Sequence, residues 1–174
     1  MCQFLSAIVL RNGDVLCDPE HSDSHEDLIN NFNLRDDQIS NFLERFVRIE
    51  FTPPEDHSKI ADFSSWALKV DEHSIPSWFD ETKTRQDLEG MIKPHIVTDD
   101  RKLLLGNWWI LSGNAKVETV KNATIVLMND SSQVQRMLDS SLVQRMLDSS
   151  QVHEMFDSSQ VQRMLDSSLV QRML

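Results

Sequence analysis

The sequence contains little glycine, little cysteine and no long apolar run, and each shortage excludes a class of protein. Four glycines in 174 residues leave no glycine-rich loop of the kind that cradles nucleotide phosphates. Two cysteines, Cys2 and Cys17, are too few for a disulfide framework and agree with a reducing compartment. No apolar stretch approaches the roughly 20 residues that cross a bilayer, and the short run over residues 4–10 lacks the basic flank of a secretory signal. We therefore expect a cytoplasmic protein that does not bind membranes.

Basic side chains are also in the minority. The chain carries 17 basic and 28 acidic residues, a net charge of -11, which opposes direct binding to nucleic acid. It is 40% hydrophobic and 26% charged, and such a chain folds. Its length suits one ordinary domain, or a small domain with an appended module.

A nine-residue repeat dominates the end of the sequence. The unit SSQVQRMLD occupies residues 131–139 and returns unchanged at 158–166, and SSLVQRML occupies 140–147 and returns at 167–174. Between them lies the variant unit SSQVHEMFD. This order is what duplication of a 27-residue block would leave.

Weaker copies of the unit extend toward the N-terminus. Val117 and Val120 are three residues apart, as are apolar residues within the segment NATIVLMND. The array therefore begins near Gly113, or already at Leu111.

A nine-residue period leaves few folds open. In a continuous strand or a continuous α-helix, equivalent residues nine positions apart would face roughly opposite sides, so neither structure would bury all of them in one stripe. A coil that closes after nine or eighteen residues returns every valine and methionine to the interior. We therefore predict a β-solenoid with Val134, Met137 and their equivalents in the core and Asp-Ser-Ser at the corners. A row of short helices, capped by Asp-Ser-Ser, is the rival interpretation.

The tandem SSQVQRM and SSLVQRM units resemble nonapeptide arrays of uncharacterised phage and bacterial proteins, some of which carry a pentapeptide-repeat label. The resemblance covers about a third of the chain. True pentapeptide repeats place an inward residue every five positions, whereas Val134, Met137 and Val143 are spaced three and six. The four-sided pentapeptide fold and the gyrase-directed DNA mimicry of some members are therefore not implied. The resemblance implies a phage-linked protein and no known activity.

Directly before its methionine each unit carries a charged residue, which is arginine in four units and Glu154 in the variant unit. In a coil of either length Glu154 would lie among arginines and relieve their mutual repulsion. We interpret this ladder as a solvated face.

The last unit predicts self-association. Solenoids usually need a cap, because the last coil exposes its interior and an unpaired backbone edge. Trp108 and Trp109 are suited to cover the first coil, but nothing in the sequence covers Val170, Met173 and Leu174. We expect these three residues to form the interface of a symmetric homodimer.

Residues 1–105 have the pattern of a small α+β domain, with the repeat module over 106–174. Asn12-Gly13 between apolar runs predicts a hairpin. The other expected elements are a capped helix over about 23–33, a short helical stretch over 36–42, strands over 46–51 and 66–70, a helix over 77–91 with Trp78 and Phe79 on its apolar side, and strands over 96–97 and 103–105.

Cys2 is the leading candidate for chemistry. If the initiator methionine is removed, the amine of Cys2 could activate its own thiol for acyl transfer. The Met-Cys opening is similar to glutamine amidotransferases of the N-terminal nucleophile type and to abasic-site-linking proteins. Only Cys2 matches these families, in which glycine is common at the next position, whereas this chain has Gln3. An enzyme built around Cys2 is therefore the alternative function, and a buried structural cysteine is the plainer interpretation.

Cys17, His21 and His25 are spaced four apart, so on a helix they would share one face and could ligate zinc. Pro19 interrupts such a helix. We expect a polar loop that leads into a capped helix, without a metal or another cofactor.

Acidic pairs in the first domain are the candidate binding residues. They are Asp36, Asp37, Asp71, Glu72, Asp80 and Glu81. Such pairs give solubility, and they also suit docking on a basic partner. The leading hypothesis is a non-enzymatic, phage-linked binding or inhibitor protein whose acidic surface engages a host protein, for example one of a host defence system.

Overall fold

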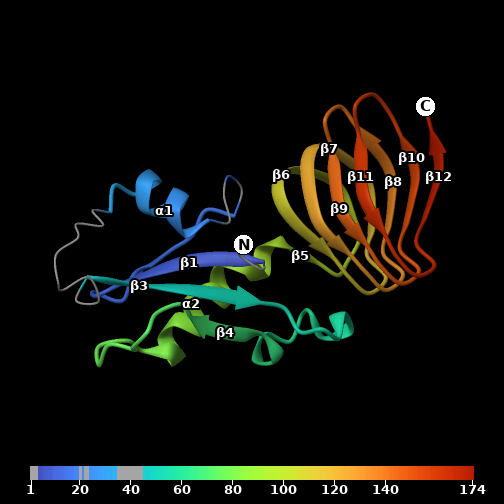
Figure 1. The fold of residues 1–174 in the computed structure, drawn as a ribbon. Coiled ribbons are helices and arrows are strands. Elements are labelled where there is room, and N and C mark those ends of the chain that lie inside the picture. Colours follow the sequence, from blue (N-terminus) through green and yellow to red (C-terminus); the bar gives the residue numbers. More distant parts are fainter. Residues whose placement is uncertain (1–3, 20, 22–23, 35–44) are drawn as a thin grey trace. The chain divides into compact units, whose positions relative to one another are not determined.

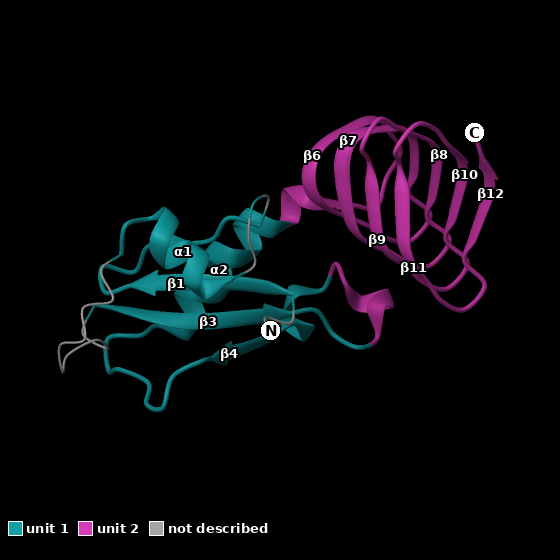
Figure 2. Cartoon of the chain, turned by 45° about the horizontal axis from the view of Figure 1, so that its top comes forward, with its two compact units in different colours: residues 1–55, 62–92 teal, residues 56–61, 93–174 magenta. Residues whose placement is uncertain are grey.

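The chain forms two compact units in a computed structural model that describes residues 4–19, 21, 24–34 and 45–174 (Figure 1). Unit 1 comprises residues 1–55 and 62–92, and unit 2 comprises residues 56–61 and 93–174 (Figure 2). The boundary expected between residues 105 and 106 falls inside a strand of unit 2. Unit 2 therefore begins before the repeat array and includes six residues from the first half of the sequence.

The described residues of unit 1 form one antiparallel sheet and two α-helices. The strand order is β2-β1-β3-β4. The strands are β1 (Leu5–Leu10), β2 (Val15–Leu16), β3 (Phe46–Thr52) and β4 (Ala67–Val70), and the helices are α1 (His25–Asn31) and α2 (Glu81–Ile92). The expected α+β character is met only in this loose sense. The helical stretch expected over 36–42 lies outside the described residues.

Local sequence signals place most of these elements. Strands β1 and β2 form the expected hairpin, with Gly13 at a φ of 86° in the turn. Ser24 is the N-cap of α1, as the capping pattern predicts. Helix α2 begins later than expected, because the Asp80 side chain accepts a hydrogen bond from the Lys83 amide at 3.0 Å and so caps the helix there. The expectation that Trp78 and Phe79 lie on this helix is therefore wrong, since both precede it.

Unit 2 is a parallel β-solenoid of about four turns, with few helical residues. Its strands are β5 (Ile96–Val97), β6 (Arg101–Leu111), β7 (Lys116–Met128), β8 (Gln133–Leu138), β9 (Leu142–Met146), β10 (Gln151–Met155), β11 (Gln160–Met164) and β12 (Leu169–Met173). The predicted solenoid is confirmed, and the rival row of short helices is wrong. The first coil uses β5 and β6, so the solenoid starts ahead of Gly113, in a segment that lacks the repeat sequence.

The coil closes after eighteen residues. Val152 lies opposite Val134 and Val170, each eighteen residues away. Val161 lies opposite Val143 in the same way. Each coil thus holds two repeat units, one on the sheet of β8, β10 and β12 and one on the sheet of β9 and β11. Strand β7 bends from the first sheet to the second, pairing with β8 and then with β9.

The interior of the solenoid is a stack of valine and methionine. The apolar repeat residues buried to 3% exposure or less are Val134, Met137, Val143, Met146, Val152 and Met155. Stacking like on like at every coil removes these side chains from water, which is the main stabilising contribution to such a fold. Trp109 packs against this core from within β6, a strand of the first coil, rather than covering that coil as expected, and the ring centroid of His95 lies 5.1 Å from that of Trp109.

Aspartates make the corners of the coil. Asp130, Asp139, Asp148, Asp157 and Asp166 all have φ values between 55° and 57°, a left-handed conformation that aspartate tolerates better than most residues. The amide of Asp130 donates to the carboxylate of Asp148 at 3.1 Å, and the amide of Asp148 donates to that of Asp166 at 3.3 Å. We call this arrangement the aspartate staircase. It ties each coil to the next and confirms the predicted Asp-Ser-Ser corners.

Candidate functional site

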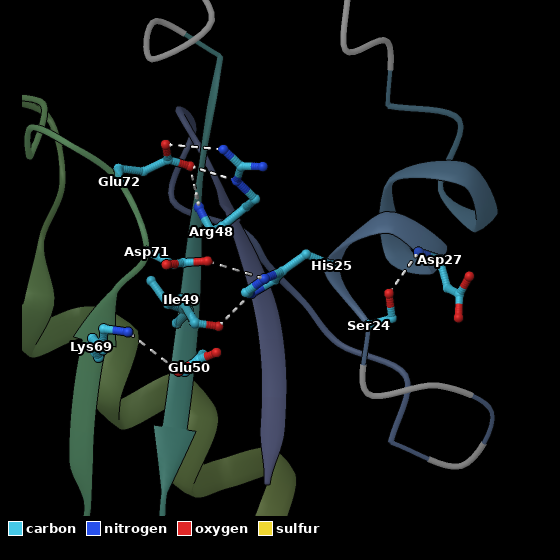
Figure 3. Close-up of polar contacts among 9 residues, drawn as sticks. All are labelled: Ser24, His25, Asp27, Arg48, Ile49, Glu50, Lys69, Asp71 and Glu72. Atoms are coloured by element: carbon cyan, nitrogen blue, oxygen red, sulfur yellow. Dashed lines mark hydrogen bonds and ion pairs between the residues drawn. The ribbon is translucent and has the colours of Figure 1, made fainter. Parts of the chain in front are cut away.

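The four described acidic residues predicted to bind a partner lie on two elements of unit 1. Asp71 and Glu72 directly follow β4, and Asp80 and Glu81 lie at the start of α2. The Glu72 carboxylate accepts hydrogen bonds from Arg48 Nε at 2.8 Å and Nη2 at 3.2 Å (Figure 3), and its side chain is only 7% exposed. Glu72 is therefore committed to an internal ion pair. Asp36 and Asp37 lie outside the described residues.

The other three acids are exposed, and each makes a local contact. Asp80 caps α2, and Glu81 pairs with Arg85 Nε at 2.8 Å one turn along the same helix. Asp71 Oδ2 lies 3.9 Å from Nδ1 of His25. These carboxylates remain accessible to solvent, so they give unit 1 an acidic surface.

His25 fixes the start of α1 against the sheet. Its buried ring donates from Nε2 to the backbone carbonyl of Ile49 in β3 at 2.8 Å, and Nδ1 faces Asp71 (Figure 3). Both ring nitrogens are thus directed at groups of the fold itself. Nε2 is therefore not available as a zinc ligand or as a general base toward a substrate.

The structure separates the three residues of the hypothetical zinc site. Cys17 follows β2 and donates from Sγ to Met91 Sδ at 3.5 Å, while His21 contacts Asp18 at 2.7 Å. Burial, together with the neighbouring Asp18, raises the pKa of the Cys17 thiol to about 11, so it stays protonated and unreactive near neutral pH. Within the described ranges, no three metal-ligating side chains gather in one place. Cys2 lies outside those ranges.

The last coil of unit 2 exposes the side chains that the other coils bury. Five of its apolar residues are exposed by 41% to 76%, and these are Met164, Leu165, Leu169, Met173 and Leu174. Val161 and Val170 are partly buried against the core. Strand β12 pairs with β10 and strand β11 with β9, which leaves the outer edge of both strands open in the described structure. The three predicted interface residues, Val170, Met173 and Leu174, lie together on this coil, which we call the terminal coil.

The outer face of the sheet of β8, β10 and β12 carries a polar groove of about 480 Å³. It is lined by Gln135, Arg136, His153, Glu154, Gln171 and Arg172. The lining residues bond to one another, as Arg172 does to Glu154 at 3.1 Å and His153 to Gln171 at 3.1 Å. This groove behaves as a side-chain ladder between stacked coils.

The eighteen-residue coil determines which arginines lie next to Glu154 in the stack. Glu154 lies opposite Arg136 and Arg172 on its own sheet, whereas Arg145 lies opposite Arg163 on the other sheet. The expected relief of repulsion therefore operates on one sheet only. On the other sheet, burial and the charge of Arg163 lower the pKa of Arg145.

Sequence patterns gave no indication that residues 56–61 belong to unit 2. Ile60 is fully buried, and the His57 carbonyl accepts a hydrogen bond from Asn129 Nδ2 at 3.0 Å. Burial and the charge of Arg145 lower the pKa of His57. The segment contains no repeat unit, so only tertiary packing could identify its place.

Helices in the described part of the chain are all too short or too polar to cross a lipid bilayer. Comparison of the chain with protein family models, with curated proteins and with solved structures found no match.

Proposed function

We propose that this chain is a non-enzymatic binding protein that forms a homodimer through its terminal coil. The observation that carries the proposal is the exposure of core-type side chains there, with Met173 at 76%, where its equivalent Met155 in the preceding coil is at 3%. An open β edge beside exposed apolar side chains is a template for pairing with another chain. A second copy brings the same strands and the same side chains to this edge.

The proposal assigns partner binding to unit 1. Unit 1 contains seven basic and eighteen acidic residues, whereas unit 2 contains ten of each, so the whole net charge of the chain resides in unit 1. A surface of one sign attracts a partner of the opposite sign and speeds the encounter. For a phage-linked chain the partner would be a basic protein of the host, contacted by exposed acids such as Asp71, Asp80 and Glu81.

Light scattering on the full chain at micromolar concentration tests the dimer. We expect a dimer for the natural sequence and a monomer for Met173→Glu, because a charge in the interface would be buried without a partner. Ile75→Glu is the matched control, since Ile75 is 63% exposed but lies in unit 1. A monomeric natural chain contradicts the proposed dimer.

Affinity capture from host lysate tests the binding surface and separates it from the Cys2 alternative. We expect Cys2→Ala to retain the stoichiometric partner of the natural chain, and Asp71→Lys with Glu81→Lys to lose it. Melting curves of the variants show whether unit 1 stays folded. Loss of the partner with Cys2→Ala alone would favour the Cys2 enzyme.

A further inference from the structure

We infer that the polar groove on the outer face of β8, β10 and β12 is a binding site for a neutral polyhydroxy ligand, a saccharide, with His153 at its centre. All of its lining residues belong to unit 2. The site uses outward side chains, whereas the proposed dimer uses inward ones, so this inference does not rest on the proposed function.

The variant repeat unit gives the groove its floor. Its outward pair is His153 and Glu154, whereas the coils on either side carry a glutamine and an arginine at these positions. His153 and Glu154 are half-buried, and the neighbouring glutamines and arginines are exposed. The longer arginine side chains therefore form two walls that are two strand spacings, about 10 Å, apart. The resulting groove of about 480 Å³ has the size of a small-ligand pocket.

His153 carries a buried acceptor that lacks a donor. Its Nδ1 lies 3.1 Å from Oε1 of Gln171, whose own Nε2 donates to Gln151 at 3.3 Å. This pattern assigns the ring proton to Nδ1, because only a donor can face the Gln171 oxygen. Nε2 of the neutral ring is then an acceptor, and it is buried without a hydrogen-bond partner among the described residues. The exposed side chains of the walls change rotamer readily, which gives a ligand donor access to Nε2.

Arg136 supplies unused donors in the same groove. It donates from Nη2 to Thr119 Oγ1 at 3.3 Å and forms no ion pair with a described carboxylate. Glu154, its neighbour in the sheet, is already paired with Arg172 at 3.1 Å. A guanidinium has five N–H donors, so most of those of Arg136 remain for a ligand oxygen.

This combination of an unused acceptor and unused donors favours a hydroxyl group. An oxyanion such as phosphate would satisfy Arg136, but it would be repelled by the Glu154 carboxylate and could not donate to His153 Nε2. An ammonium group would satisfy His153 but would be repelled by the arginines on both walls. A hydroxyl group both donates and accepts, so it matches the two sites without a cost in charge. Saccharides present several such groups on one compact ring.

The groove continues along the stack toward the first coil. A second depression of about 360 Å³ shares Gln135 with it. The other residues that line this depression are Asp100, Arg101, Lys102, Lys116 and Glu118. The strand register places one column of outward residues across both depressions, and these are Lys102, Glu118, Gln135, His153 and Gln171. Four strand spacings make the column about 19 Å long. Donors and acceptors alternate along it, which suits an oligosaccharide that lies across the strands.

Titration of the full chain with neutral oligosaccharides, followed by NMR of the histidine rings and side-chain amides, tests the site. The probes are linear tetrasaccharides of glucose, galactose, mannose and N-acetylglucosamine, and inorganic phosphate serves as the anionic comparison. We expect at least one tetrasaccharide to bind with a dissociation constant of about 1 mM or tighter and to shift the signals of His153 and Gln135.

Two variants remove the groups that carry the inference. His153→Val has no polar side-chain atom and suits a strand, and Arg136→Gln removes the guanidinium. Each should weaken tetrasaccharide binding by at least about tenfold, the effect of losing one well-made hydrogen bond. Arg163→Gln makes the same change in β11 on the other sheet and should leave the affinity within about twofold. Melting curves show whether each variant stays folded.

The possible outcomes separate the site from the class of ligand. Tetrasaccharide binding that both groove variants weaken, and Arg163→Gln does not, supports the inference. Binding that survives both groove variants places the saccharide elsewhere and overturns it. Phosphate that binds more tightly than every tetrasaccharide, and is lost with Arg136→Gln, overturns the ligand class in favour of an anion. Failure of all four tetrasaccharides to bind overturns the inference outright.

Discussion

Corner aspartates combine two demands that few residues meet together. Asp148 adopts a φ of 55° and accepts a hydrogen bond from the Asp130 amide. We expect Asp148→Ala to destabilise unit 2 by about 2 kcal/mol, from the left-handed strain of alanine and the lost hydrogen bond. Asp148→Asn should cost little, because Asn122 already serves at an equivalent corner, with a φ of 46° and an oxygen that accepts from the Ser140 amide.

Denaturant unfolding of the two variants and of Asp148→Gly checks this account. Glycine relieves the left-handed strain but cannot accept the hydrogen bond, so the stability of Asp148→Gly should lie between that of the asparagine and alanine variants. Equal stability of the alanine and asparagine variants would show that the aspartate staircase contributes nothing.

His57 makes the stability of unit 2 depend on pH. Its pKa in the folded chain is lower than the value of about 6.5 expected when unfolded, so the unfolded chain binds this proton more readily. The resulting destabilisation is absent above about pH 6.5 and grows as the pH falls below that value. Relative to His57→Gln, the natural chain should therefore lose melting temperature between about pH 7 and pH 5. Parallel melting curves for the two proteins would disprove a role for His57.

Strands of the solenoid interact through columns of side chains eighteen residues apart. Glu154→Arg restores the common repeat residue and stacks three arginines in the column of Arg136 and Arg172. We expect a loss of about 1 kcal/mol at low salt that shrinks at high salt, because the exposed charges are screened. His153→Gln restores the neighbouring repeat residue without changing the arginine column, so its effect should not depend on salt. A loss for Glu154→Arg that is equal at low and high salt would contradict repulsion as the cause.

The sequence predicts elements well wherever one local signal decides them. The hairpin at Gly13, the cap at Ser24 and the Asp-Ser-Ser corners all follow from turn and cap chemistry. The start of α2 is harder to predict, because both Pro76 and Asp80 are residues that often begin a helix. The structure shows that Asp80 caps it. The sequence alone does not distinguish a coil of nine residues from one of eighteen, since either period returns the same residues to the core.

Segments joined only by packing could not be predicted. The first coil at β5 and β6 and the segment 56–61 share no repeat pattern with the array, so their place in unit 2 was missed. Among the candidate binding residues, Glu72 looked like an exposed acid, and its pairing with Arg48 depends on contacts between β3 and the residue after β4. Such contacts join residues 24 positions apart and leave no periodic signal.

For the molecule as a whole, the two proposed interactions should respond to salt in opposite ways. Partner binding by the acidic unit 1 should weaken at high salt, as the screening length falls from about 10 Å at 0.1 M to about 3 Å at 1 M. The dimer should change by no more than about twofold, because its proposed interface is apolar. Sedimentation of the chain alone and with its captured partner measures both. A dimer that dissociates in salt would place the interface elsewhere.

The eighteen-residue coil also governs how the gene can lengthen or shorten this array. Units of identical sequence form β8 on one sheet and β11 on the other, so the interior accepts a unit in either position. Recombination can therefore add or remove any whole number of units without harming the core. The columns of charged residues on the outer faces, however, change when an odd number of units is added or removed, because each later unit then moves to the opposite sheet. Loss of the unit at residues 140–148, for example, would move Glu154 to the opposite sheet together with Arg172, and would set Arg136 opposite Arg163.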